Sequence, residues 1–239
     1  MADDSGATTL EPRAREIWEA RASATPLAGE EWGEVSIDEA WTMFAELGAA
    51  LESSGSPQIG AKIGEPDAET QARMGLNGPV VAKTFANSLL EDGDTVQLSA
   101  LISPLFEMEI GLRLGADGAK PVPCIEIVDS RFEWKTEGGQ MIADFASSAH
   151  LLFGPAADDP PATVKAVASC NGEVIADGTR ELQEALDKLP KVESALPGEA
   201  YEGEHLIATG SLNTPGPLTP GDWEFDFGDL GKLALTVEE

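Results

Sequence analysis

The feature that most constrains this chain is an apolar run that two glutamates interrupt. Residues 106–110 read Phe-Glu-Met-Glu-Ile, so Glu107 and Glu109 stand two positions apart. Side chains two apart on a strand point to the same face of a sheet. Two like charges on one buried face are costly unless a cation lies between them. The run therefore indicates either a strand that carries a cation site or an edge strand whose polar face is exposed.

A second apolar run offers a third carboxylate. Residues 123–129 read Pro-Cys-Ile-Glu-Ile-Val-Asp, with Glu126 between residues that are typical of a core. If the two runs are neighbouring strands, Glu107, Glu109 and Glu126 supply a ligand set made of oxygen atoms. Mg²⁺ or Mn²⁺ accepts such a set and keeps open positions for a chelating substrate. We therefore predict a divalent metal site at these three glutamates.

The charge balance excludes some classes of partner. The chain has 239 residues with 15 basic and 43 acidic side chains, a formal net charge of −28. Such a chain repels nucleic acids and anionic membrane surfaces. Its hydrophobic fraction of 42% argues against disorder. We interpret the charge as halophilic adaptation to a salty cytoplasm, with an ordinary acidic bacterial enzyme as the alternative.

Two further observations bear on location. The chain has no apolar run of the roughly 18 residues that a membrane helix requires, and Met1 to Leu10 lacks the basic and apolar regions of a signal peptide. We expect a cytoplasmic protein that does not bind membranes. Cys124 and Cys170 stand in apolar surroundings and are predicted to be buried free thiols.

The order of patterns predicts an α+β fold. Helices are expected at Glu11–Ala24 and from Ser36, where Ser36 and Glu39 have capping-box spacing. One more helix is expected near Thr179–Leu189. Short apolar runs between turn residues predict strands at 58–63, 96–101, 105–114, 123–129, 149–153, 163–169, 173–176, 205–209 and 232–237. This predicts a helical N-terminal region at 1–57 and a β-rich catalytic domain at 58–239.

Several segments, in this order, resemble a known family. They are Gly60–Gly64, Pro104–Ile110, Pro123–Arg131, Ala143–Ser148, Asn171–Val174, Ala208–Leu212 and Pro220–Asp222. They are similar to the 2-hydroxypenta-2,4-dienoate (2-keto-4-pentenoate) hydratases and the 4-oxalocrotonate decarboxylases of the fumarylacetoacetate hydrolase superfamily. The resemblance covers most of the chain from about Glu11. It implies a mixed, rolled β-domain preceded by helices, with Glu107, Glu109 and Glu126 at the family's metal-ligand positions.

The resemblance also implies chemistry. The metal chelates the 1-carboxylate and 2-oxygen of a small 2-oxo or 2-hydroxydienoic acid, from the breakdown of aromatic compounds. A hydratase then adds water to the conjugated double bond, whereas a decarboxylase releases carbon dioxide. Lys62 matches the active-site lysine and is expected to help electrostatically, or to transfer a proton if burial lowers its pKa. Ser147 matches a serine that binds substrate or water, with packing as a small core residue as the alternative.

Other residues have structural expectations. Asp129 and Arg131 are expected to form a pair that orients Glu126, or else a salt bridge at a strand end. His150 and His205 are expected to be structural, because each stands at the start of an apolar strand.

Departures from the family pattern keep several functions open. Val80 stands where many hydratases have an aspartate, and Phe145 replaces an asparagine. The hydratase remains the leading interpretation, with the decarboxylase next. A third is a catalytically silent homologue that acts as the partner subunit of a related hydratase or decarboxylase. Hydrolysis of an acylpyruvate is disfavoured because no His–Glu pair is evident near the N-terminal side. A homo-oligomer is expected.

Overall fold

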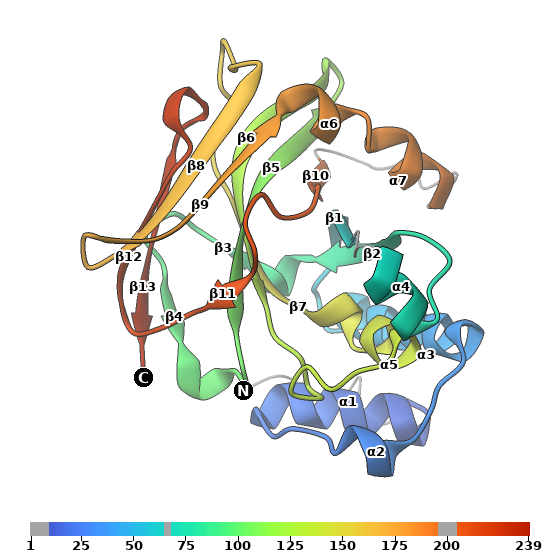
Figure 1. Cartoon of the computed structure of the whole chain (residues 1–239). Coiled ribbons are helices and arrows are strands. Elements are labelled where there is room, and N and C mark those ends of the chain that lie inside the picture. The colour runs from blue at the N-terminus through green and yellow to red at the C-terminus, as the bar shows by residue number, and fades with distance from the viewer. Residues whose placement is uncertain (1–9, 65–67, 196–204) are drawn as a thin grey trace.

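The computed structural model describes residues 10–64, 68–195 and 205–239, which form two β-sheets and a group of helices (Figure 1). The larger sheet has the order β2-β1-β10-β5-β6-β7-β3, and β11 pairs with β5. The smaller sheet has the order β4-β13-β12-β8-β9. The strands of the larger sheet are β1 (Gln58–Gly64), β2 (Val80–Phe85), β3 (Leu89–Leu90), β5 (Leu105–Gly115), β6 (Gly118–Val128), β7 (Ser148–Phe153), β10 (His205–Ala208) and β11 (Gly216–Pro217). Those of the smaller sheet are β4 (Thr95–Gln97), β8 (Thr163–Cys170), β9 (Glu173–Glu181), β12 (Gly221–Asp226) and β13 (Lys232–Glu238).

The helices lie mainly on one side of the larger sheet (Figure 1). They are α1 (Pro12–Ser23), α2 (Gly29–Trp32), α3 (Ile37–Ser53), α4 (Ala68–Met74), α5 (Gly138–Ala143), α6 (Leu182–Leu186) and α7 (Leu189–Ala195). The predicted capping box is present, because the Ser36 side chain accepts from the Glu39 N–H and the Glu39 carboxylate accepts from the Ser36 N–H. None of the described helices has the length and apolar character needed to cross a bilayer.

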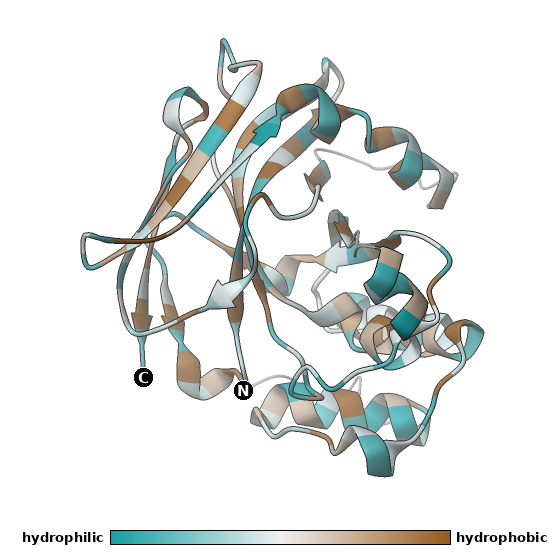
Figure 2. Ribbon diagram, viewed as in Figure 1, coloured by the Kyte–Doolittle hydropathy of each residue, from teal (hydrophilic) through white to brown (hydrophobic). Residues whose placement is uncertain are grey.

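A hydrophobic core lies between the two sheets. On β5, Phe106, Met108 and Ile110 are fully buried and belong to the same cluster as Trp223 and Phe225 of β12. Strand β8 also alternates buried and more exposed residues. Figure 2 shows apolar and polar residues following one another along its ribbon. Because side chains alternate along a strand, this packing turns Glu107 and Glu109 to the opposite face of β5.

Strand pairing then decides which residues meet on that face. In the β5–β6 hairpin, Glu107 is paired with Glu126, and Glu109 with Cys124. Strand β1 joins the sheet through parallel pairing with β10, where Lys62 is opposite Ala208. The sheet therefore presents residues from β1, β5, β6 and β10 on one surface.

The N-terminal helices share a core with later elements. Phe44 and Leu47 of α3 belong to the same cluster as Phe85 of β2 and Phe145. Strand β1 begins at Gln58, where the β-rich part was expected to start. The division into a helical region at 1–57 and a catalytic domain at 58–239 stays a prediction. Cys124 and Cys170 are buried free thiols, as predicted.

The predicted helix near Thr179–Leu189 is wrong in its first part. Strand β9 continues to Glu181, because Thr179 and Arg180 pair with β8, and α6 begins only at Leu182. The predicted strand at 96–101 ends early, since β4 stops at Gln97 and a 3₁₀ turn follows at Leu98–Ala100. Strands β2 and β12 were not predicted. Long-range pairing, which local patterns do not show, decides these segments.

Candidate metal centre and its cavity

Three carboxylates converge on the face of the larger sheet that is turned away from the core between the two sheets. Oxygen atoms of Glu107, Glu109 and Glu126 lie within 4.8 Å of one another. Glu109 and Glu126 are buried, at 1% and 2% exposure, and Glu107 is half-buried. Glu107 and Glu126 line a cavity of about 500 Å³, whose walls include Val80, Val128 and other apolar residues. The structure thus brings the three predicted ligands together beside a space for a small molecule.

Mutual repulsion and burial make the charged forms of these groups unfavourable. Burial raises the pKa of Glu107 to about 7, and the charge of Glu126 adds to the effect. Burial likewise raises the pKa of Glu109 to about 8, with further contributions from Glu126 and Glu107. A cluster of carboxylates with this property favours the binding of a cation among them.

Lys62 is the cation that the chain itself places at the cluster. Its Nζ lies 2.7 Å from Glu126 Oε1 and donates a second hydrogen bond to the Ala146 carbonyl at 2.9 Å. Burial acts to lower the pKa of Lys62, but Glu126, Glu107 and Glu109 outweigh it, so the pKa is raised. With these carboxylates as neighbours, Lys62 is protonated, which favours the electrostatic role over the proton-transfer role.

The segment Thr209–Ser211 positions Glu109. The Gly210 N–H donates to Glu109 Oε2 at 2.8 Å, and the Thr209 hydroxyl donates to the Ile110 carbonyl at 2.6 Å. Arg180 of β9 donates to the carbonyls of Gly210 and Ser211. Gly210 has φ +95°, a conformation that other residues rarely adopt, so a glycine is needed at this position. The hydroxyl of Thr209 fixes the segment to β5 just before it.

Ser147 lies in a strained turn beside Lys62. Phe145, Ala146 and Ser147 have φ values of 53°, 51° and 59°, which is uncommon for three successive residues with side chains. This turn directs the Ala146 carbonyl toward Lys62 and leaves Ser147, which is 5% exposed, in the cavity wall. Ser147 is therefore near the cluster, and its catalytic role stays a prediction.

Asp129 and Arg131 form the salt bridge at a strand end that was the alternative expectation, directly after β6, and their described contacts lead to other residues than Glu126. Arg131 forms a buried ion pair with Asp144 and donates to the Asp144 carbonyl at 2.9 Å. Asp129 lies 3.9 Å from Arg131 and accepts the N–H groups of Ile102 and Ser103. Arg131 begins the turn at 131–134, and its backbone N–H also donates to Asp144 Oδ2 at 2.9 Å, which holds Arg131 beside Asp144. In the described part of the chain, Lys62 is the side-chain partner of Glu126.

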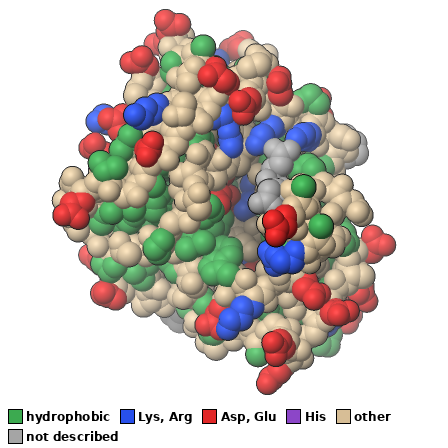
Figure 3. Space-filling view, in the orientation of Figure 1, with side chains coloured by type: hydrophobic (Ala, Val, Ile, Leu, Met, Phe, Trp, Pro, Cys, Tyr) green, Lys and Arg blue, Asp and Glu red, His purple; other side chains and the backbone are tan. Residues whose placement is uncertain are grey.

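Basic residues that the sequence did not single out complete the cavity. Arg73 of α4, Arg180 of β9 and Lys188, which follows α6, line it together with Lys62. Figure 3 shows several basic side chains around the hollow in this face, whereas acidic side chains lie mostly toward the outline. Arg73 stands far from Arg180 and Lys188 in the sequence, and the three share no motif. The one property of the sequence that could have drawn attention to them is that basic residues are scarce in this acidic chain.

Comparison with known proteins finds relatives that align with most of this chain. The 2-hydroxyhexa-2,4-dienoate hydratase of Comamonas testosteroni is 29% identical over 257 aligned positions, 96% of this chain and 97% of the relative. The 4-oxalocrotonate decarboxylase of Pseudomonas sp. (strain CF600) is 27% identical over 223, covering 82% and 83%. The chain is thus similar in sequence, over most of its length, to curated hydratases and decarboxylases of the kind that its motifs resemble. No family model matched the chain in a separate scan.

A solved structure has the same fold as this chain. The 4-oxalocrotonate decarboxylase from Pseudomonas putida G7, described as complexed with magnesium and adipate, has a TM-score of 0.80 and 23% identity. The match covers 95% of this chain and 96% of that chain. This chain therefore shares the fold of that decarboxylase, helices followed by a curled, mixed sheet, which is the fold class expected from the sequence.

The two departures from the family pattern differ in their positions. Val80 is 3% exposed and lines the cavity, so an apolar side chain stands where many hydratases have an aspartate. Phe145 packs against Phe44 and Phe85 at ring distances of 5.5 and 6.1 Å, within the helical core. The Phe145 side chain therefore belongs to the core and does not line the cavity.

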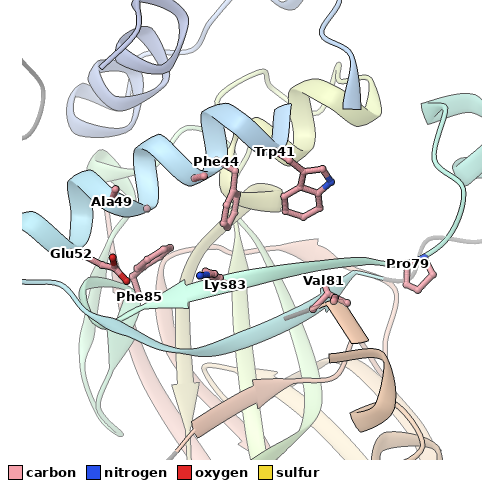
Figure 4. A pocket seen from close by; sticks show the side chains of 11 residues that line it. Trp41, Phe44, Ala49, Glu52, Pro79, Val81, Lys83 and Phe85 are labelled. Atoms are coloured by element: carbon pink, nitrogen blue, oxygen red, sulfur yellow. The ribbon is translucent and has the colours of Figure 1, made fainter. Parts of the chain in front are cut away.

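A second cavity is lined mostly by apolar side chains. This groove of about 530 Å³ lies between α3 and β2, with Trp41 and Phe44 facing Val81 and Phe85 (Figure 4). Its lining contains Glu52 and Lys83 but no group of carboxylates. Neither histidine lines the cavity at the glutamates, and both stand in strands, His150 in β7 and His205 in β10. The candidate active site is therefore the cavity at Glu107, Glu109 and Glu126.

Proposed function

We propose that this chain is a metal-dependent lyase that adds water to a 2-hydroxydienoic or 2-oxo-enoic acid. The observation that carries the proposal is the cluster of Glu107, Glu109 and Glu126 beside Lys62 at a cavity large enough for a small acid. Hydratase homologues that align with nearly the whole chain support it.

The residues fit a hard divalent cation. All three candidate ligands offer carboxylate oxygens, which Mg²⁺ and Mn²⁺ prefer. Cys124 is opposite Glu109, but burial raises the pKa of its thiol, so it is a poor ligand. A bound ion would supply Lewis-acid polarisation of the substrate's 1-carboxylate and 2-oxygen.

The other residues have roles that follow from their places. Lys62 holds Glu126 in position and brings a positive charge to the cavity, where it stabilises negative charge that develops on the substrate. Ser147 offers a hydroxyl that can position water or a substrate oxygen. Apolar walls at Leu105, Val128 and Met141 receive the carbon chain and limit the access of water.

A decarboxylase is the second candidate, and Val80 favours it. Hydration needs a group that moves a proton at the reacting carbon. Among the described residues that line the cavity, the acidic side chains are Glu107 and Glu126, both candidate ligands. Release of carbon dioxide from a 2-oxo diacid needs the electron sink at the 2-oxygen but no activated water. Because decarboxylation needs no group that activates water, the apolar side chain of Val80 at the cavity is compatible with it.

One assay distinguishes the two reactions. Purified protein with Mg²⁺ or Mn²⁺ is offered 2-hydroxypenta-2,4-dienoate and 2-oxohex-3-enedioate, and ultraviolet absorbance and released carbon dioxide are followed. Loss of dienol absorbance without carbon dioxide indicates the hydratase. Release of carbon dioxide from the diacid indicates the decarboxylase. If neither substrate reacts, the lyase proposal is wrong, and a silent partner subunit becomes the better interpretation.

The substitution Lys62→Met tests the role of Lys62. We expect loss of turnover with Mg²⁺ affinity kept, because the three carboxylates remain. Removing one partner of a buried ion pair costs about 3–5 kcal/mol of stability, so the melting temperature is measured with saturating Mg²⁺. Lys165→Met on β8, an exposed lysine outside the cavity, is the matched control. Full activity in Lys62→Met would remove Lys62 from the mechanism.

A further inference from the structure

A third cavity, of about 820 Å³, is lined by residues of α1, the end of α3 and strand β7. It shares no lining residue with the cavity at the three glutamates. One short segment contributes to both, because Ala146 and Ser147 line the cavity at the glutamates, whereas Ala149 and His150 line the third cavity. The third cavity is therefore a separate space beside the proposed active site.

Arg21 brings to the third cavity a guanidinium that is not paired with a carboxylate. Its Nη1 and Nη2 atoms donate to the carbonyls of Ser148 and Ala149, at 3.0 and 3.3 Å. Among the residues that the structure describes, Arg21 forms no ion pair. Burial, with repulsion from Arg131, lowers the pKa of Arg21 to about 10, so it stays charged at neutral pH. A guanidinium has five N–H donors, so Arg21 keeps donors for a ligand.

The other titratable groups of the lining favour a ligand with a single negative charge. Arg131 is held between Asp144, which is fully buried and does not line the cavity, and Asp129, which does. Burial lowers the pKa of His150 to about 4, so it is neutral at pH 7. The side chains that line the cavity thus have one positive charge in excess, that of Arg21. Asp129 would repel a second negative charge.

Apolar side chains form much of the remaining wall. Trp18 of α1, Leu51 of α3, and Leu101 and Ile102 after the 3₁₀ turn all line the third cavity. Such walls with one ionic group suit an organic ligand better than an inorganic ion. We propose that the third cavity binds a small monocarboxylic acid with an apolar body, whose carboxylate accepts hydrogen bonds from Arg21. A planar guanidinium is the group suited to binding a carboxylate with two parallel hydrogen bonds.

The proposal does not depend on the lyase reaction, because none of the three glutamates lines this cavity. Benzoate and benzamide are the probes, since they have nearly the same shape and differ in charge. Their binding to the Mg²⁺-saturated protein is measured by calorimetry at pH 7. We expect benzoate to bind about tenfold more tightly, as for a charge-assisted contact. Equal affinities, or no binding of benzoate, would overturn the proposal.

Inorganic phosphate tests the choice of an organic acid. We expect it not to displace benzoate at equal concentration, because it has no apolar body to fill the cavity. Displacement of benzoate by phosphate would show that the cavity is a site for a simple anion, and the proposed ligand class would be wrong.

Two substitutions at Ala22 locate the bound probe with little risk to the fold. Ala22 is exposed on α1 and lines the third cavity. We expect Ala22→Glu to weaken benzoate binding about threefold and Ala22→Lys to strengthen it, with benzamide unaffected, as for charges near the surface. Arg21→Met is expected to abolish the preference for benzoate. Its melting temperature is measured too, because Arg21 also holds the carbonyls of Ser148 and Ala149.

Arg73→Met is the matched control, because it removes a positive charge from the cavity at the glutamates. It should keep the full preference for benzoate. If Arg73→Met loses the preference, and the Ala22 variants bind benzoate as the unchanged protein does, benzoate occupies the other cavity. That result would overturn the proposal and leave the lyase proposal standing.

Discussion

At the residue scale, buried charges dominate this molecule. Glu109, Glu126 and Lys62 are each at most 5% exposed, and they are held by one another and by backbone groups. Burial of like charges is expensive, so their arrangement is evidence of a ligand rather than of stability. If these carboxylates bind a cation, substitution of any one of them should change the affinity for that cation.

Replacement of a candidate ligand should weaken metal binding. We expect Glu109→Gln to lower the Mg²⁺ affinity by at least the ~10-fold that is typical of a disturbed ligand set. The variant keeps the shape of the side chain but removes an anionic donor. Calorimetric titration with Mg²⁺ measures the effect, and Glu19→Gln at an exposed position of α1 is the control. Equal affinities in Glu109→Gln and in the unchanged protein would exclude Glu109 as a ligand.

His150 predicts a dependence of stability on pH. Burial, with help from the charge of Arg21, lowers the pKa of His150 from 6.5 to about 4. Between these values the unfolded state binds more protons than the folded state, so stability falls as the pH falls. From pH 7 to pH 5 the loss from this group is about 2 kcal/mol.

Comparison with the variant His150→Gln isolates the contribution of His150 to the pH dependence of stability, because all other titratable groups are present in both proteins. Urea unfolding at pH 7 and pH 5 is the measurement, with Mg²⁺ present in both. We expect the loss of stability between the two pH values to be smaller in the variant. An equal loss in both proteins would show that His150 is protonated in the folded state.

At the element scale, β1 shows why the two glycines of Gly-Ala-Lys-Ile-Gly are not equivalent. A Cβ on Gly60 would lie 1.8 Å from the Leu206 carbonyl oxygen of β10, whereas one on Gly64 would meet only the Val80 oxygen at 3.9 Å. Gly60 thus permits the close pairing that brings Lys62 into the sheet.

The matched pair Gly60→Ala and Gly64→Ala tests this difference within one strand. Gly60→Ala must force β1 and β10 apart, and we expect it to lower stability by about 3 kcal/mol or more. Gly64→Ala is expected to change stability little, because its Cβ makes an ordinary contact. The midpoint of urea unfolding measures both. Similar midpoints for the two variants would contradict the close approach of β1 to β10.

At the scale of the whole molecule, the acidic surface dominates. With 43 acidic and 15 basic side chains, most carboxylates cannot have a basic partner of their own. Most of the acidic residues that the structure describes are exposed to water. Their repulsion is screened by salt, since the Debye length falls from about 30 Å at 0.01 M to about 3 Å at 1 M. The excess of negative charge is therefore expected to make folding depend on ionic strength.

We expect the melting temperature of the Mg²⁺-saturated protein to rise with potassium chloride through the molar range. Differential scanning calorimetry between 0.05 M and 2 M salt measures it. A non-ionic osmolyte at matched water activity is the control, and it should reproduce less of the gain. A flat or falling melting temperature would show that the charge is not an adaptation to salt.

What the sequence determined by itself was local. The two-residue period of a strand put Glu107 and Glu109 on one face, and Ser36 with Glu39 marked the start of α3, because both patterns act within a few residues. Only the tertiary structure decided that β9 continues through Arg180, that Arg131 pairs with Asp144, and which bases surround the cavity. Those outcomes depend on pairing between segments far apart in the chain, where register and packing outweigh local preference.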